Sequence, residues 1–409
     1  MQLTFIDLFA GVGGMSEGFL QARHGGIPLF RPLLLVDVDE IAAYTFQRNR
    51  PRVRYLVQDV RSLTGKDLRR AAGMSGGETL DALIGGPPCQ GFSALRHNSP
   101  LDDPRNALLK EFLRLARDLE PRFILIENVK NLLHYDGGRF RDKVVAALEK
   151  MGYRSEAETL NAHQYGVPQI RERAFIAAFR SDTKIREFHF PKGKFPPLKF
   201  AKALMDDDGE PTPEILTPYI SVEEAIGDLP PLQAGQAAQF YTMEPFTDYQ
   251  YARRRGAALL HNHEARNHSA DFLRKIARIS PGASNQDLDG RRRFDRARLI
   301  KYFSQAYGRL HPNGIAYTIT THFLNPGSGR FMHYRDLRSI TVREAARFQG
   351  FDDDFVFYGR VEQQQELVGN AVPPILARVL AEHFGEMLLE KEEASTLWRT
   401  RSLGKSAAK

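Results

Sequence analysis

"LTFIDLFAGVGG", residues 3–14, is an apolar run that ends in a glycine-rich turn. The run has the length of a buried strand, and Asp7 inside it argues against a secretory leader. A helical pattern follows at once in residues 15–23, so the stretch predicts a strand, a tight turn and a helix. That order is the first unit of an open α/β sheet.

The alternation of strand and helix continues to about residue 180. Further strands are predicted at residues 30–39, 53–60, 80–86, 122–129 and 173–179, and helices at 40–49, 106–119 and 140–152. The pattern predicts a doubly wound α/β fold with a parallel or mostly parallel sheet. Proline-rich loops then replace it, until helical patterns return at residues 341–351 and 361–390.

The chain has 409 residues, a formal net charge of +7 and a single cysteine. One cysteine excludes an intramolecular disulfide framework and a cysteine-rich zinc site, and it favours a reducing, cytoplasmic compartment. The positive charge is compatible with nucleic acid as a partner and equally with an ordinary solvated surface. No apolar run approaches the length that crosses a membrane, so we expect no membrane partner.

The glycine turn lets the backbone bend tightly and approach a ligand through Gly11, Gly13 and Gly14. A complete dinucleotide fingerprint would need a third glycine where Ser16 stands. The turn alone therefore indicates either a nucleotide site or an ordinary connection between a strand and a helix.

Acidic residues close the next two predicted strands. Asp37 and Asp39 could accept hydrogen bonds from ribose hydroxyls, and Asp59 could accept one from an adenine amino group. Taken singly, each is also an ordinary helix N-cap. Because the carboxyl ends of parallel strands share one edge of a sheet, the acids and the glycine turn together predict a nucleoside site.

The only cysteine lies on a stiff turn at the end of the fourth predicted strand. Cys89 follows Pro87 and Pro88, which fix the backbone and lack amide donors. A lone cysteine is more often a small core residue than a nucleophile. A proline–proline–cysteine turn at a strand end is unusual packing, however, and favours a nucleophile held rigidly in a cleft.

Six segments resemble, in order, the motifs of the DNA cytosine-5 methyltransferase family: "FIDLFAGVGGMSEGF", "GGPPCQGFS", "ENV", "QYGVPQIRERAFI", "TVREAARFQGF" and "VGNAVPP". The resemblance implies a Rossmann-like S-adenosylmethionine-dependent methyltransferase domain with a smaller target-recognition domain inserted. We expect residues 1–185, completed by 362–395, to form the catalytic domain, residues 186–361 the recognition domain, and 396–409 a flexible tail.

The resemblance also implies a chemistry. The thiolate of Cys89 would add to carbon 6 of a cytosine flipped out of double-stranded DNA. Carbon 5 would then accept the methyl group of S-adenosylmethionine, with S-adenosylhomocysteine as product. Glu127 would be the general acid at ring nitrogen 3, Arg173 would contact the base oxygen, and Arg171 would support the site through a phosphate or Glu127.

Further binding residues follow from the resemblance or from their place in the chain. Those expected to bind the methyl donor are Phe9, Gly11, Gly13, Gly14, Asp37, Asp39, Asp59, Pro87, Asn370 and Val372. Those expected to contact DNA are Gln90, Ser93, Asn128, Thr318, Thr320 and Arg330. The alternating "AYTITTHF", residues 316–323, predicts a strand that holds a reading loop, and we place sequence readout within residues 245–335.

Two other functions stay open: a tRNA cytosine-5 methyltransferase of the same family, and a non-catalytic DNA-binding regulator. The long insert favours DNA, and the intact cysteine, glutamate and arginine pair favour an enzyme. His261, His263 and His268 lie close together without zinc-site spacing, so we expect no metal. We expect a protein that acts on DNA as a monomer, in a restriction–modification system or alone.

Overall fold

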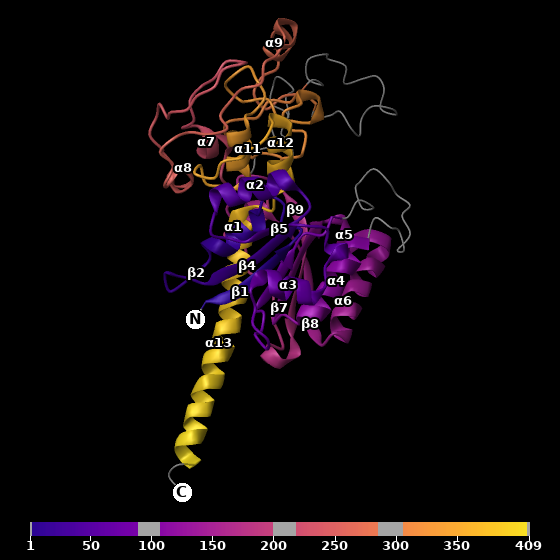
Figure 1. Cartoon of the computed structure of the whole chain (residues 1–409). Helices are drawn as coiled ribbons and strands as arrows, with labels where there is room; N and C mark the ends of the chain where they lie inside the picture. Colours follow the sequence, from indigo (N-terminus) through magenta and orange to yellow (C-terminus); the bar gives the residue numbers. More distant parts are fainter. Residues whose placement is uncertain (1, 89–106, 199–217, 285–305, 407–409) are drawn as a thin grey trace.

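Seven strands form one sheet in the computed structural model, which describes residues 2–88, 107–198, 218–284 and 306–406. Their spatial order is β5-β4-β1-β6-β7-β9-β8. Figure 1 shows the sheet with α1, α2 and α13 on one side and α4 and α6 on the other. The bounds are β1 Leu3–Leu8, β4 Phe30–Asp37, β5 Tyr55–Val57, β6 Ala82–Gly85, β7 Phe123–Val129, β8 Tyr153–Asn161 and β9 Glu172–Arg180. Strands β5, β4, β1, β6 and β7 are parallel to one another. Strand β9 lies between β7 and β8 and runs antiparallel to both. The mostly parallel sheet that the sequence predicted is confirmed.

Helices cover both faces of the sheet and confirm the doubly wound arrangement. One face packs against α1 Gly14–Gln21, α2 Glu40–Asn49 and α13 Pro374–Ser406. The other face packs against α3 Gly65–Ala72, α4 Ala107–Leu119, α5 Asn131–His134 and α6 Arg139–Lys150. Each face therefore buries its own apolar layer, and the strand ends are left to form the site.

Two pairings were not predicted from the sequence. Strand β8 forms one edge of the sheet, with burial that alternates along its length. A small hairpin, β2 Arg23–His24 with β3 Ile27–Pro28, lies between α1 and β4. The hairpin is exposed, and in β8 only Tyr153 and Leu160 are buried, so neither gave an apolar run to recognise.

The described residues between β9 and α13 contain short helices and isolated bridges but no strand of the main sheet. The helices are α7 Val222–Ile226, α8 Asp248–Arg254, α9 Ala270–Ile276, α11 Val342–Gln349 and α12 Val361–Asn370. The strand predicted at residues 316–323 is wrong, because only Ala316 makes a bridge there, to Gln169. Side chains rather than a neighbouring strand bind the rest of this segment: Ile319 donates its amide to the Gln169 side chain.

The single helix predicted over residues 361–390 is also wrong. Helix α12 ends at Asn370, Ala371 is extended, and α13 begins at Pro374. Pro373 and Pro374 cannot donate backbone hydrogen bonds, so the first helix cannot continue through them. Helix α13 then runs to Ser406, past residue 395. Among the described residues, no helix is both long and apolar enough to span a bilayer.

Candidate active site

The glycine turn lies at the carboxyl edge of the sheet and combines close packing with one open position. A Cβ at Gly13 would lie 2.3 Å from the Phe46 ring, and one at Gly14 would lie 2.3 Å from the Val372 carbonyl oxygen. A Cβ at Gly11, in contrast, would meet nothing within 4 Å. Phe9 takes a positive φ of 60°, which is rare for a side chain of its size. The turn is thus closely packed at Gly13 and Gly14 and open at Gly11, as a ligand-binding loop must be.

Asp37 connects this turn to the end of β4. Its Oδ2 accepts the Gly11 amide at 2.8 Å, and its Oδ1 accepts the Asp39 amide at 3.0 Å. The Gly11 carbonyl accepts the Tyr55 hydroxyl at 2.7 Å. Asp37 is only half-buried, so it remains able to accept further hydrogen bonds from a ligand.

The other two acids serve as helix caps in this structure. Asp39 caps α2 by accepting the amides of Ile41 and Ala42. Asp59 caps a short 3₁₀ turn and pairs with Arg61, whose hydrogen bonds lower the pKa of Asp59. The structure therefore brings Asp37 to the glycine turn, while Asp39 and Asp59 satisfy local backbone amides.

Sequence reasoning missed two apolar side chains at this edge. Val38 is 62% exposed and Val57 is 43% exposed, directly beside the ends of β4 and β5. Exposed valines next to a polar loop offer a surface for a flat apolar ligand group. The signal in the sequence was weak, because Val57 only ends a short apolar run and Val38 stands alone between Asp37 and Asp39.

A buried acid lies beneath the glycine turn. Asp7 on β1 is 1% exposed, and its Oδ2 accepts the Ser16 hydroxyl at 2.6 Å. Burial, together with the charge of Asp37, raises the pKa of Asp7 to about 8, although the Ser16 bond acts in the opposite direction. Asp7 therefore holds a proton at neutral pH, which limits the negative charge beside Asp37.

Glu127, at the end of β7, lies next to the turn that leads to the cysteine. A Cβ at Gly86 would lie 3.1 Å from its Oε2, and the neighbouring Asn128 donates to the Pro87 carbonyl at 2.9 Å. Arg173 on β9 pairs with Glu127, with Nε 3.1 Å from Oε1. Burial raises the pKa of Glu127 even though the Arg173 and Arg171 charges lower it, so burial favours the protonated acid.

Arg171 is fully buried and bonds to backbone rather than to a carboxylate. It donates to the carbonyls of Ile319, Gly369 and Ala371 at 2.9, 2.9 and 3.1 Å. Burial lowers its pKa well below the ordinary value for arginine. Arg171 thus joins its own strand to residue 319 and to residues 369–371.

The site residues predicted between residues 318 and 372 occupy different environments. Val372 is buried against the glycine turn, whereas Asn370 is exposed. Thr318 donates its hydroxyl to the Ile170 carbonyl at 2.7 Å, and the Thr320 hydroxyl accepts the His322 amide at 3.3 Å.

The guanidinium of Arg330 is hydrogen-bonded to backbone carbonyls of the protein itself. It donates to the Gly282 and Arg309 carbonyls and lies over the Tyr317 ring at 5.6 Å. A guanine contact by Arg330 would require these bonds to be exchanged. Cys89, Gln90 and Ser93 lie outside the described residues.

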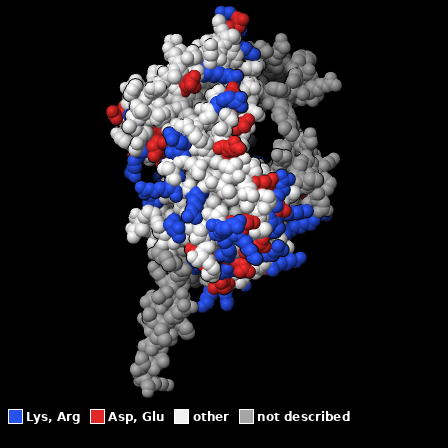
Figure 2. All heavy atoms as spheres, viewed as in Figure 1, with Lys and Arg blue, Asp and Glu red and all other residues white. Residues whose placement is uncertain are grey.

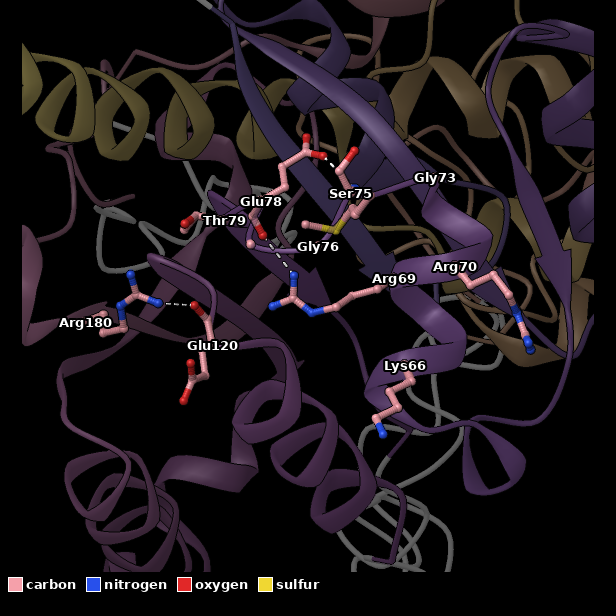
Figure 3. Close-up of a pocket in the computed structure, with 12 residues that line it drawn as sticks. Lys66, Arg69, Arg70, Gly73, Ser75, Gly76, Glu78, Thr79, Glu120 and Arg180 are labelled. Carbon is pink, nitrogen blue, oxygen red and sulfur yellow. Dashed lines mark hydrogen bonds between the residues drawn. The ribbon is translucent and has the colours of Figure 1, made fainter.

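A cavity of about 700 Å³ lies elsewhere, among α3, the loop before β6 and the end of β9 (Figure 3). Thr79 and Glu120 precede the parallel strands β6 and β7, so this cavity faces the amino edge of the sheet. Its arginines are already bonded: Arg69 donates to the Glu78 carbonyl at 2.8 Å, and Arg180 donates to the Glu120 carbonyl. It is therefore distinct from the site at the carboxyl edge.

The histidines take structural partners. His263 is buried between the Thr341 hydroxyl and the Pro230 carbonyl, and His268 contacts Ser339. Within the described ranges, no group of three potential ligands could hold a metal ion. Figure 2 shows Lys and Arg gathered over the sheet-bearing half of one face, with acidic residues among them.

Comparisons with known proteins agree on one family. A model of the family described as C-5 cytosine-specific DNA methylase matches residues 3–386. The Type II methyltransferase M1.HphI of Haemophilus parahaemolyticus is 34% identical over 93% of this chain and 86% of its own length. M.DdeI of Desulfomicrobium norvegicum is 33% identical over 93% of this chain and 88% of its own.

Solved structures share the fold. A candidate DNA modification methyltransferase encoded within an E. coli prophage superposes with a TM-score of 0.69 at 25% identity, over 95% of this chain and 99% of that one. A DNMT2 mutant of Spodoptera frugiperda gives 0.56 at 16% identity, over 95% and 100% of the two chains, which shows the fold alone.

Proposed function

The chain belongs to the C-5 cytosine-specific DNA methylase family and is a DNA (cytosine-5)-methyltransferase, and we propose how its residues divide the reaction. The carboxyl edge of the sheet binds the methyl donor, and the turn after β6 with Glu127 and Arg173 acts on the base. The observation that carries the proposal is the Glu127–Arg173 pair beside the Gly86–Pro87 turn, within a family match that spans the catalytic motifs.

The glycine turn and its neighbours suit S-adenosylmethionine, which supplies an electrophilic methyl group on a sulfonium when bound. Gly11 has open space above it, and Asp37 has acceptor capacity for ribose hydroxyls. The exposed Val38 and Val57 suit the two faces of a planar base. The remaining predicted contacts are Phe9, Gly13, Gly14, Asp39, Asp59, Pro87, Asn370 and Val372.

Covalent attack by Cys89 is the central step of the proposal. Its thiolate forms a bond from Sγ to carbon 6 of cytosine, which makes carbon 5 electron-rich. After carbon 5 has accepted the methyl group, a base takes the carbon 5 proton, and the Sγ–carbon 6 bond breaks to restore the ring double bond and release the thiolate. A free thiol with a pKa of about 8.5 is only a few per cent ionised at neutral pH, so the ring must be activated as well.

Glu127 provides that activation. Its largely buried carboxyl, with a raised pKa, donates a proton towards ring nitrogen 3 as the thiolate adds. Arg173 holds the carboxyl through Nε, and we propose that it also contacts the base oxygen. Asn128 fixes the backbone before the cysteine through the Pro87 carbonyl. The target base must leave the duplex to reach these groups, at a cost of a few kcal/mol.

Sequence readout is assigned to the inserted part of the chain. We place the recognition domain at residues 186–361 and the reading segment within 245–335, with Gln90 and Ser93 closing on DNA near the base. The relatives M1.HphI and M.DdeI are Type II methyltransferases, and a modification role at one short DNA site fits this chain as well. Grafting residues 245–335 onto a relative of known target tests the assignment, because a chimera that keeps its host's specificity would refute it.

The function is tested by methyl transfer in vitro. Purified protein, S-adenosylmethionine and duplex DNA are incubated, and bisulfite sequencing maps 5-methylcytosine. We expect methylation at one recurrent short sequence in DNA, and none in a parallel reaction with tRNA. Methylation of tRNA alone, or no methylation with Cys89 intact, would overturn the proposal.

A further inference from the structure

The turn between α12 and α13 forms one wall of the glycine turn. A Cβ on Gly14 would lie 2.3 Å from the Val372 carbonyl oxygen and 3.1 Å from the Ala371 side chain. The backbone of residues 371–372 thus touches the start of α1 directly. Any shift of this turn would change the shape of the loop that we assign to the methyl donor.

Four side-chain bonds also hold this turn: two from Arg171 and two from Gln349, the second of which reaches the Ala371 carbonyl at 3.5 Å. The last carbonyls of a helix have no helical partner and need other donors. Gln349 donates its Nε2 to the Val368 carbonyl at 2.6 Å, and Arg171 donates to the Gly369 and Ala371 carbonyls. Gln349 is fully buried, so water does not replace its bond.

A second glutamine continues the chain of hydrogen bonds. Gln169 donates its Nε2 to Gln349 Oε1 at 3.0 Å and to the Phe348 carbonyl at 3.0 Å. Its own Oε1 accepts the Ile319 amide at 2.7 Å. Both amide side chains are therefore paired at nitrogen and oxygen, and a fully paired buried network fixes a single geometry.

We propose that Gln349 and Gln169 are positioning residues for the methyl-donor pocket. They hold residues 368–372 against Gly14 and thereby set donor affinity without touching the donor. An apolar side chain of equal length would fill the same space, but it would leave the Val368 carbonyl with only the Ala371 amide, at 3.3 Å, as donor. The proposal rests on the donor pocket assigned above, and it adds two residues that are distant from the reacting atoms.

The test compares donor binding in two matched glutamine variants. Gln349→Met removes the bond to the turn at nearly constant volume. Gln365→Met is the control, because Gln365 is also buried and bonds the Thr321 carbonyl and the Leu324 amide, but not residues 368–372. Calorimetry with S-adenosylhomocysteine measures affinity, and thermal unfolding measures stability for both.

We expect Gln349→Met to weaken S-adenosylhomocysteine about tenfold, the loss that one buried hydrogen bond of typical strength produces. The KM for the donor should rise by a similar factor while kcat at saturating donor changes little. Gln365→Met should lose stability but keep wild-type donor affinity.

Gln349→Glu adds a readout that simple destabilisation would not produce. A protonated glutamate can donate to the Val368 carbonyl and accept from Gln169, so this variant should regain donor affinity relative to wild type as pH falls.

Wild-type affinity in a folded Gln349→Met protein, or equal losses in Gln349→Met and Gln365→Met, would overturn the inference alone. Failure of the wild-type protein to bind S-adenosylhomocysteine would overturn the donor pocket and the inference together. If Gln349→Met does not fold, Gln169→Met replaces it with the same expected result.

Discussion

Replacing Asp7 by asparagine should change how the stability of the protein depends on pH. Asp7 is buried on β1 under the glycine turn, and burial raises its pKa from 3.8 to about 8. The folded protein therefore holds a proton that the unfolded chain releases above pH 4. The Asp7→Asn side chain would keep the shape and could still accept the Ser16 hydroxyl, but it would not titrate.

The sign and size follow from proton linkage. Between pH 4 and pH 8 folding takes up one proton at Asp7, so this residue lowers the free energy of unfolding as pH rises. The slope is about 1.4 kcal/mol per pH unit. The free energy of unfolding of the wild type minus that of Asp7→Asn should therefore fall by about 3 kcal/mol from pH 5 to pH 7. This difference should level off above pH 8.

Urea unfolding of both proteins at pH 5, 6, 7 and 8, without methyl donor, measures this difference. Ile84→Val is the matched control, since Ile84 pairs with Asp7 in the sheet, is fully buried and carries no charge. It should cost about 0.5–1.5 kcal/mol at every pH. A difference between wild type and Asp7→Asn that is the same at pH 5 and pH 7 would refute the assignment of the proton to Asp7.

Three further predictions concern chemistry and packing. Cys89→Ala should abolish methyl transfer while calorimetry shows unchanged S-adenosylhomocysteine binding; appreciable turnover would exclude covalent catalysis. Asp37→Ala should weaken donor binding more than it lowers kcat, and Glu127→Gln should do the reverse; equal donor affinity in Asp37→Ala and wild type would contradict the ribose assignment. Arg347→Met should lower the free energy of unfolding by about 3–5 kcal/mol, because it removes the closest cation from the buried Asp228 and Asp353 and leaves them only the longer pairs with Arg254 and Arg343; a urea midpoint equal to that of the wild type would show that the Arg347 charge is not needed.

The sequence revealed those parts of the site that lie at the ends of buried strands. The apolar runs 32–36 in β4 and 123–126 in β7 end in Asp37 and Glu127, so these acids stood out as the first polar residues after them. The order of strands and helices then placed these ends on one edge. Strand periodicity therefore predicted the position of both acids, whereas the caps made by Asp39 and Asp59 depend on local backbone geometry.

The positioning residues could not be found in this way. Arg171 bonds to carbonyls that lie 148 to 200 residues away in the chain. Every residue has a backbone carbonyl, so the residue types in the sequence do not indicate which carbonyl accepts such a bond. Gln169 and Gln349 likewise have no charged or apolar partner whose spacing could be recognised.

The same reasoning explains how the described residues between β9 and α11 are held together without strands of the main sheet. Backbone carbonyls that are not in a ladder still need donors when buried. Arg343 donates to the carbonyls of His261, Asp352 and Phe355, and Arg309 donates to those of Ile279, His333 and Tyr334. Each planar guanidinium thus bonds several loop carbonyls, and both arginines are buried. Lysine has the charge but not the planar fork, so Arg→Lys at either position should free loop carbonyls rather than preserve the fold.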